Sequence, residues 1–219
     1  MTDVSFLAGV EMLDQLNEAE LQQLAEVAEN RQMRRGDTLF AEDDPSEELY
    51  VVVRGRIAIA KRSMDGRESM MALMEQGDLF GEMPLFDQKG RSAEARALEP
   101  SEVIVIPYSA LRAIYESRPE LLWGVTDMLV SRLRGVDDAL ADSVFLDVTG
   151  RTAKRLLELA GDADEFSLPI TQEELAGMVG ASRERVNKAI ASFIRLGWIE
   201  QHDRRYRILD REQLSRRAI

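Results

Sequence analysis

The stretch ITQEELAGMVGASRERVNKAI, residues 170–190, carries the local signals that decide the fold of the last third of the chain. Thr171 and Glu174 have the spacing of a capping box, which predicts that a helix begins there. Gly180 suits the left-handed residue that ends a helix, and Ser182 suits the cap of the next helix. Two helices joined by so short a turn predict a helix-turn-helix.

The second helix of this pair, which we expect to reach about Leu196, has two chemically different faces. Helical spacing places a set of apolar side chains on the core face: Val186, Ala189, Ile190, Phe193 and Ile194. The opposite face carries Arg183, Glu184, Asn187 and Lys188. Long polar side chains near a helix N-terminus are typical of recognition helices that read base edges in the major groove of DNA. The alternative is an ordinary solvated helix face.

A basic hairpin is expected after the second helix. Residues 198–201 and 205–209 have the pattern of two strands around the turn His202-Asp203-Arg204. Arg204 and Arg205 lie at or beside this turn, where they would contact DNA phosphates and position the protein without reading sequence. Before the helix pair, a further helix is expected over residues 151–159.

Between about Gly36 and Pro107 the apolar residues recur with a period of two, which is typical of strands. Four short runs carry this pattern: 49–53, 56–62, 69–74 and 103–106. Glycine turns separate the runs, among them Gln76-Gly77-Asp78 and Asp65-Gly66. These features predict a small barrel or sandwich of many short strands rather than a Rossmann fold, preceded by a short helix within residues 11–30.

Pro119 begins a helical pattern that runs to about Phe145. A seam of residues spaced alternately by four and three follows this helix: Leu122, Thr126, Leu129, Leu133, Val136, Leu140 and Ser143. Heptad spacing is typical of coiled coils, so we expect two copies of the chain to form a homodimer along the seam. The alternative is an amphipathic helix that packs on its own β-domain.

A second informative stretch is GDLFGEMPLF, residues 77–86, which Arg91-Ser92-Ala93 follows. Gly81 permits a ligand to approach the backbone closely. The amides of a short helical turn there could hold an anion, Arg91 could pair with a phosphate, and Glu82 could accept hydrogen bonds from sugar hydroxyls. From spacing alone, a surface loop with an Arg–Glu ion pair is the simpler interpretation.

The composition excludes most enzyme chemistries. The 219 residues contain no cysteine and one histidine, His202, so thiolate nucleophiles, cysteine-held clusters and multi-histidine metal sites lack material. We therefore expect a binding protein with neither catalytic residues nor a metal. A cupin-like barrel enzyme is the alternative from another class, and the single histidine argues against it.

The charge distribution is uneven along the chain. The net charge is −12, yet residues 182–217 hold ten basic and five acidic side chains. This contrast predicts a DNA-binding region attached to an acidic body. No apolar run reaches the length of a membrane helix and the N-terminus has no basic signal region, so we expect a cytoplasmic protein that does not contact a membrane.

Three motifs together resemble one protein family. FGEMPLF and RSA, residues 80–86 and 91–93, look like the phosphate-binding cassette of cyclic-nucleotide-binding domains. The stretch 170–190 resembles the helix-turn-helix of the cyclic AMP receptor protein and fumarate–nitrate reductase regulator family of bacterial transcription factors, and FLDVTGR, residues 145–151, resembles its interdomain hinge. The motifs occur in the family's order, and the chain is most similar to the cyclic AMP receptor branch.

The resemblance implies an α+β fold. It implies an N-terminal antiparallel β-roll of the cyclic-nucleotide-binding type in residues 1–118, a dimerisation helix and hinge in residues 119–146, and a C-terminal winged helix-turn-helix in residues 147–219. It further implies a homodimeric regulator that binds cyclic AMP, a near-palindromic operator in double-stranded DNA, and RNA polymerase.

The resemblance also implies roles for the ligand-site residues. Gly81, Glu82 and Met83 would contact the ribose and phosphate of cyclic AMP, and Arg91 and Ser92 would hold the phosphate. The segment 66–72 would lie beside the base.

In the DNA-binding region, the match places Arg183, Glu184 and Lys188 at base-reading positions. Ser182 and Asn187 complete the expected contact set on this helix.

One departure from the family pattern affects the expected ligand. The family grips the adenine with two small polar residues on the dimer helix, and the matching positions hold Val136 and Asp137. Val136 offers no hydroxyl, whereas Asp137 could accept a hydrogen bond from an adenine or a guanine edge. The alternatives to cyclic AMP are therefore another nucleotide, such as a cyclic dinucleotide, or DNA binding without a ligand. Pro84 also replaces the usual small residue of the cassette turn.

Overall fold

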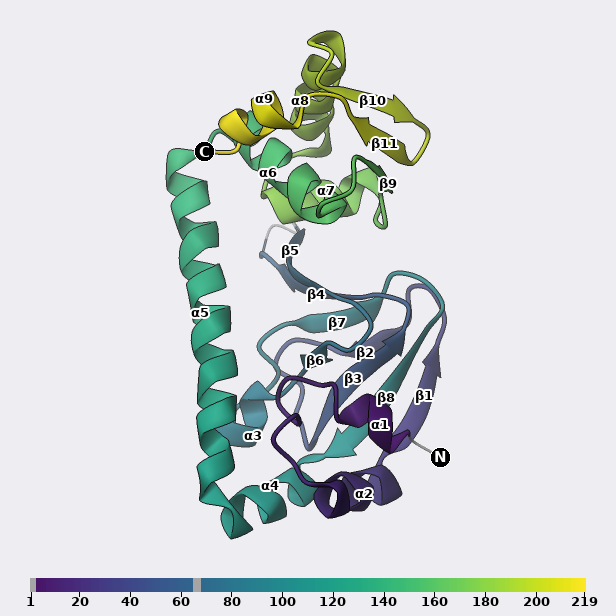
Figure 1. The fold of residues 1–219 in the computed structure, drawn as a ribbon, viewed down its shortest axis with the longest axis vertical. Coiled ribbons are helices and arrows are strands. Elements are labelled where there is room, and N and C mark those ends of the chain that lie inside the picture. Colours follow the sequence, from purple (N-terminus) through teal and green to yellow (C-terminus); the bar gives the residue numbers. More distant parts are fainter. Residues whose placement is uncertain (1–2, 65–67) are drawn as a thin grey trace. The chain divides into compact units, whose positions relative to one another are not determined.

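The computed structural model describes residues 3–64 and 68–219, which form two compact units. One unit takes in the described residues within Met1–Arg67 together with Met71–Leu133, and the other takes in Glu68–Met70 together with Arg134–Ile219. The fold is α+β, as the sequence predicts (Figure 1). The expected turn at Asp65-Gly66, and with it the start of the segment 66–72, lies outside the described residues.

Two four-stranded sheets form most of the first unit. Their strands are β1 (Glu29–Met33), β2 (Thr38–Phe40), β3 (Glu48–Arg54), β4 (Ile57–Arg62), β5 (Glu68–Met74), β6 (Leu79–Phe80), β7 (Glu94–Ala97) and β8 (Ser101–Pro107). Only the first three residues of one strand, β5, are grouped with the second unit. One sheet has the antiparallel order β1-β8-β3-β6, and the other has the order β2-β7-β4-β5. The prediction of many short antiparallel strands is confirmed.

Strand β3 explains how the core divides. Leu49 and Val51 point toward the helices and belong to one apolar cluster, whereas Tyr50 and Val52 belong to a second cluster that includes Ala95 of β7 in the other sheet. Successive side chains of a strand point to opposite faces, so a strand buried on both faces needs an unbroken apolar run. The run at residues 49–53 is therefore a central strand.

The helices of the first unit are α1 (Val4–Leu7), α2 (Glu18–Val27), α3 (Met83–Asp87) and α4 (Tyr108–Ser117), followed by a 3-10 turn at Pro119–Leu121. The short helix expected within residues 11–30 is α2, which covers only part of that range. Asn17 and Glu20 form a capping box that begins α2, and Ala28 is already extended. Residues 29–33 pair with β8 instead, and their mostly exposed polar side chains give no alternating apolar signal.

Helix α5 (Leu122–Phe145) follows the 3-10 turn and contains 24 residues. In the first unit, Val125 and Met128 are buried in the apolar cluster on the helical side of β3. The predicted seam lies on a different face, where Leu133, Val136 and Leu140 are exposed in this single chain. One face of the helix therefore packs into the apolar cluster of the first unit. A second apolar face, along the predicted seam, is left exposed by the described residues.

The second unit contains α6 (Val148–Ala160), β9 (Glu165–Ser167), α7 (Gln172–Val179), α8 (Arg183–Arg195), β10 (Ile199–His202), β11 (Arg205–Ile208) and α9 (Arg211–Arg217). Helix α6 begins three residues earlier than predicted because the Asp147 carboxylate accepts a hydrogen bond from the Gly150 amide and caps it. The sheet has the order β10-β11-β9, so the predicted hairpin carries a third strand. Helix α9 was not predicted.

Candidate functional site

The cassette turn brings Gly81 against the guanidinium of Arg91. Gly81 has φ +79°, and a Cβ placed on it would lie 2.6 Å from Nη1 of Arg91 and 3.3 Å from the ring of Tyr50. A side chain at this position would be both strained and obstructed. The glycine therefore allows Arg91 to lie directly beneath the loop that leads into α3.

Arg91 is a buried cation, with 3% of its surface exposed. Its Nη1 donates to the Gly81 carbonyl at 2.9 Å, its Nη2 donates to the Glu48 carbonyl at 2.7 Å, and the guanidinium lies 4.0 Å from the centre of the Phe40 ring. Its Nε is buried and has no hydrogen-bond partner. Within the described residues no carboxylate forms an ion pair with this charge. A buried cation of this kind is well suited to an incoming anion.

Glu82 is also buried, and its charge is compensated by α5. Nη1 of Arg132 donates to Oε1 of Glu82 at 2.7 Å, and Nη2 of Arg132 donates to the Leu79 carbonyl at 2.7 Å. Arg132 thus joins the cassette to α5, although the sequence analysis did not assign it a site. Its only signal in the sequence is a basic side chain beside the apolar seam.

The predicted cassette residues share one cavity of about 120 Å³, whose lining includes Gly81, Glu82, Met83, Arg91 and Ser92. Ser92 Oγ donates to the Met83 sulfur at 3.4 Å. The volume is smaller than the roughly 300 Å³ at which ligand pockets usually begin, so a nucleotide requires side chains such as Met83 and Arg132 to move. Pro84 occupies the first turn of α3, where a missing amide costs no helical hydrogen bond but removes one donor for an anion.

Val136 and Asp137 lie farther along α5, in the second unit. Val136 is 61% exposed and Asp137 is also exposed. Neither residue lines the 120 Å³ cavity. Of the seven predicted ligand residues, the structure therefore brings five together in the first unit.

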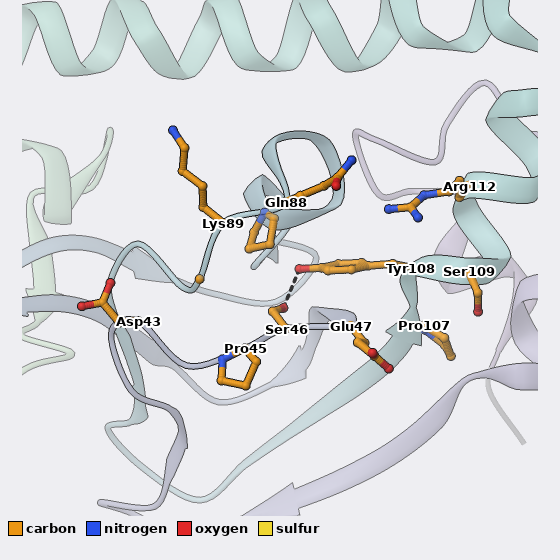
Figure 2. A pocket seen from close by; sticks show the side chains of 12 residues that line it. Asp43, Pro45, Ser46, Glu47, Gln88, Lys89, Pro107, Tyr108, Ser109 and Arg112 are labelled. Carbon is orange, nitrogen blue, oxygen red and sulfur yellow. Dashed lines mark hydrogen bonds between the residues drawn. The ribbon is translucent and has the colours of Figure 1, made fainter.

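A larger cavity of about 720 Å³ lies behind the cassette (Figure 2). Figure 2 shows the Tyr108 hydroxyl pointing toward Ser46, at 2.8 Å from its Oγ. The same hydroxyl donates to the Gly81 carbonyl and accepts from Nη1 of Arg91 at 3.2 Å. Tyr108 thus braces the cassette from its far side, and burial raises its pKa.

The second unit contains the predicted helix-turn-helix. Thr171 and Glu174 form the capping box of α7, Gly180 ends α7 in the left-handed conformation, and Ser182 caps α8. Four of the five predicted core residues on α8 are buried: Val186, Ala189, Ile190 and Phe193. Ile194 is 42% exposed, so its assignment to the core face was wrong. It lies at the edge of the apolar stripe, where helical spacing alone does not decide burial.

The polar face of α8 is exposed at Arg183, Glu184 and Lys188. Nζ of Lys188 lies 2.6 Å from Oε1 of Glu184, and this hydrogen bond lowers the pKa of Glu184. Asn187 is only half-exposed, and its Oδ1 is buried without a partner. Asn187 therefore lies at the border of the two faces rather than fully on the polar one.

Two further observations extend the basic surface. Arg185, which the sequence analysis left unassigned, lines a cavity of about 250 Å³ with Lys188 and with Asp147 and Thr149 at the start of α6. Ser182 accepts a hydrogen bond from the Arg185 amide, so its hydroxyl serves the cap.

In the wing, Arg204 and Arg205 are exposed beside Asp203, whose φ of 55° makes the tight turn. Within the described part of the chain, neither arginine forms an ion pair.

Residues 3–64 and 68–219 contain neither a metal-binding cluster of side chains nor a membrane-spanning helix. No group of three metal-ligating side chains could hold an ion there. None of the described helices combines the length and the apolar character that crossing a bilayer requires.

A β-roll that buries an arginine beneath a glycine turn, followed along the chain by a winged helix-turn-helix, is the domain composition of a class of DNA-binding regulators. Residues 30–118 match the family model of the cyclic nucleotide-binding domain, and residues 150–217 match that of the Crp-like helix-turn-helix domain. The chain belongs to the CRP/FNR family of DNA-binding transcription regulators.

Individual relatives agree with this assignment. The CRP-like cAMP-activated global transcriptional regulator of Mycobacterium tuberculosis is 41% identical over 191 residues, which cover 84% of this chain and 85% of the relative. The cAMP-activated global transcriptional regulator CRP of Salmonella typhimurium is 34% identical, covering 70% of this chain and 76% of its own. The structure of FixK2 from Bradyrhizobium japonicum has the same fold, with a TM-score of 0.80 and 23% identity over 88% of this chain and 98% of that one. These curated relatives are transcriptional regulators, not enzymes.

Proposed function

We propose that this chain is a homodimeric transcription regulator whose affinity for its operator is set by cyclic AMP bound in the β-roll. The observation that carries the proposal is the buried guanidinium of Arg91, which has an unpartnered Nε and no carboxylate partner within the described residues. The names of the curated relatives, which are cAMP-activated, support this choice of effector.

Each cassette residue has a role in this proposal. Arg91 and Ser92 hold the cyclic phosphate, and the amides of Gly81 and Met83 approach it at the start of α3. Glu82 accepts a ribose hydroxyl. Because Glu82 is paired with Arg132 of α5, ligand binding rearranges that ion pair and so reaches the helix that leads to the second unit.

Val136 and Asp137 favour a second candidate, which is a different effector on the same fold. Val136 supplies no hydroxyl to a base, and the Asp137 carboxylate accepts a hydrogen bond from adenine or guanine. Cyclic GMP and cyclic dinucleotides are such effectors, and DNA binding without a ligand is the limiting case.

The DNA-binding surface follows from the exposed residues of the second unit. In this proposal Ser182, Arg183, Glu184, Asn187 and Lys188 contact the major groove, with Arg183 and Lys188 reading guanine. Arg204 and Arg205 contact phosphates, and Arg185 makes a further phosphate contact.

The functional parts remain those of the sequence analysis. Residues 1–118 bind the effector, residues 119–146 form the dimer helix, and residues 147–219 bind DNA. Two-fold symmetry then implies a near-palindromic operator with half-sites about one helical turn apart, at which RNA polymerase is the expected partner.

Operator binding with and without nucleotide tests the proposal. Sites are selected from a random duplex library at fixed salt, and the affinity is then measured with no ligand, cyclic AMP or cyclic GMP. We expect cyclic AMP to increase the affinity for selected sites at least roughly tenfold. An equal response to cyclic GMP supports the second candidate, and failure to bind any duplex contradicts the proposal.

The homodimer has its own test. Leu133 is exposed on the seam of α5, and a Leu133→Asp substitution places a charge against its symmetry mate. We expect sedimentation to show a dimer for the wild type and a monomer for this variant, whereas a substitution at Arg134 beside the seam leaves the dimer intact. A wild-type monomer would contradict the dimer proposal.

A further inference from the structure

Helix α9 lies against α6 and is attached to both of its ends. Near the C-terminal end of α6, Nη1 of Arg211 donates to the Gly161 carbonyl at 2.9 Å and Nη2 donates to the Ala163 carbonyl at 2.6 Å. Leu214 in the middle of α9 is fully buried. At the other end, Arg217 reaches Asp147, the residue that caps α6. Helix α9 thus spans α6 from its C-cap to its N-cap.

The contact between Arg217 and the N-terminal end of α6 depends on two residues there, Asp147 and Gly150. A Cβ placed on Gly150 would lie 3.0 Å from the Arg217 carbonyl oxygen and 3.1 Å from Nη1 of Arg217, so a side chain at residue 150 would press on this contact. Asp147 is shared between two partners: Oδ1 accepts from the Gly150 amide at 2.8 Å, and Oδ2 accepts from Nη2 of Arg217. Hydrogen bonding to Gly150, with a further contribution from Arg217, holds the pKa of Asp147 below its usual value.

Asp147 is a negative charge close to basic side chains of α8, of which Lys188 already pairs with Glu184. Asp147 lines the cavity of about 250 Å³ that Arg185 and Lys188 of α8 also line. Without Arg217, a carboxylate there would repel DNA phosphates and would attract the basic side chains proposed to contact DNA. It would attract Arg185 more than Lys188, because Lys188 already pairs with Glu184. The Asp147 side chain is 61% exposed, so water and salt screen part of its field, and its effect on the basic side chains should be modest and should shrink as salt rises.

We propose that Arg217 is a positioning residue of the DNA-binding surface: from α9 it neutralises the Asp147 carboxylate and keeps it away from Arg185 and Lys188. This inference rests on the proposed DNA-binding function and assigns a role in it to a helix outside the helix-turn-helix and the wing. Helix α9 therefore serves DNA binding without contacting a base.

The matched control is Arg216, the preceding residue of α9. Among the described residues, Arg216 pairs with Glu212 alone, one turn earlier on the same exposed helix face, at 2.6 Å. Arg216→Ala and Arg217→Ala remove the same charge from the same helix, but only the second leaves Asp147 unpaired. Affinity for a selected operator and for a random duplex is measured for both variants over a series of salt concentrations.

We expect Arg217→Ala to bind both duplexes about two- to fivefold more weakly than Arg216→Ala at low salt, with the difference shrinking as salt rises. Arg217→Lys should retain most of the affinity. Adding Asp147→Asn to Arg217→Ala should restore binding to the level of Arg216→Ala, because asparagine still caps α6 but carries no charge.

Equal affinities for Arg216→Ala and Arg217→Ala would overturn the inference while leaving DNA binding itself established. A loss that Asp147→Asn fails to restore would also overturn it, since the effect would then come from the packing of α9. If the wild type binds no duplex at all, the proposed function fails and this inference fails with it. Thermal melting of each variant identifies a loss that comes from unfolding.

Discussion

Arg91 in the β-roll and Arg183 on α8 carry the same guanidinium in opposite surroundings. Arg91 is withdrawn from water beneath Gly81 and is held by backbone carbonyls and an aromatic ring, whereas Arg183 projects into solvent. A buried cation that is held in one position selects a ligand whose anionic group fits that position in shape and charge. An exposed cation contributes little to DNA binding until DNA removes its water, so we expect specificity in the second unit to depend on several side chains acting together.

The largest expected effect is the loss of the buried cation. Arg91→Ala removes the charge-assisted hydrogen bonds to a cyclic phosphate, so we expect affinity for cyclic AMP to fall at least roughly 100-fold by titration calorimetry. Arg54→Ala, which removes an exposed arginine of the same unit that pairs with Glu102, should leave the affinity unchanged. If Arg91→Ala bound cyclic AMP as tightly as the wild type, Arg91 would not be the phosphate contact, and the contrast between the buried and the exposed arginine would not hold.

Arg183→Ala tests the exposed side of the comparison. A base-reading arginine lost from each half-site should cost about 1–3 kcal/mol on the selected operator and relax the preference at one guanine. The affinity for a set of operators, each altered at one base pair, measures the loss of binding and the change in base preference. Equal weakening on operator and random duplex would instead make Arg183 a backbone contact.

The third test concerns the base rather than the phosphate. Val136→Thr combined with Asp137→Ser restores small polar side chains on α5, and one added hydrogen bond should tighten cyclic AMP binding by roughly tenfold. Titration of the double variant with cyclic AMP and cyclic GMP measures both affinity and preference. No gain for either nucleotide would mean that these positions do not contact the base.

The smallest effect is expected in the wing. Arg205→Ala should weaken operator and random duplex by similar few-fold factors, because a phosphate contact carries no sequence information. The slope of log affinity against log salt should fall by about one for the lost contact. An unchanged slope would remove Arg205 from the interface.

Local signals were sufficient for the DNA-binding unit. Thr171, Glu174, Gly180 and Ser182 act through neighbouring backbone groups, so their spacing predicted the ends of α7 and α8 from the sequence alone. Helix α9, which was not predicted, has comparable local signals, since Asp210 caps it and basic residues occupy its last turn.

Long-range contacts could not be predicted in this way. Arg132 meets Glu82, and Arg217 meets Asp147, across 50 and 70 residues of sequence. Strand β1 has polar, exposed residues because it lies at a sheet edge, so its pairing with β8 leaves no periodic trace. The motifs predicted which residues line the cassette cavity. They did not predict that the Glu82 carboxylate already accepts a hydrogen bond from Arg132.

The buried guanidinium of Arg91 has a consequence for resistance to heat. In the ligand-free protein, withdrawing this cation and its unpartnered Nε from water lowers the free energy of unfolding of the first unit. A phosphate ligand binds only the folded form and should raise the melting temperature, by an amount equivalent to about 2.7 kcal/mol at a ligand concentration of 100 Kd. Methionine at this position would fill similar space without charge but would leave the Gly81 and Glu48 carbonyls without their donor, so we expect a domain whose melting temperature a phosphate ligand no longer raises.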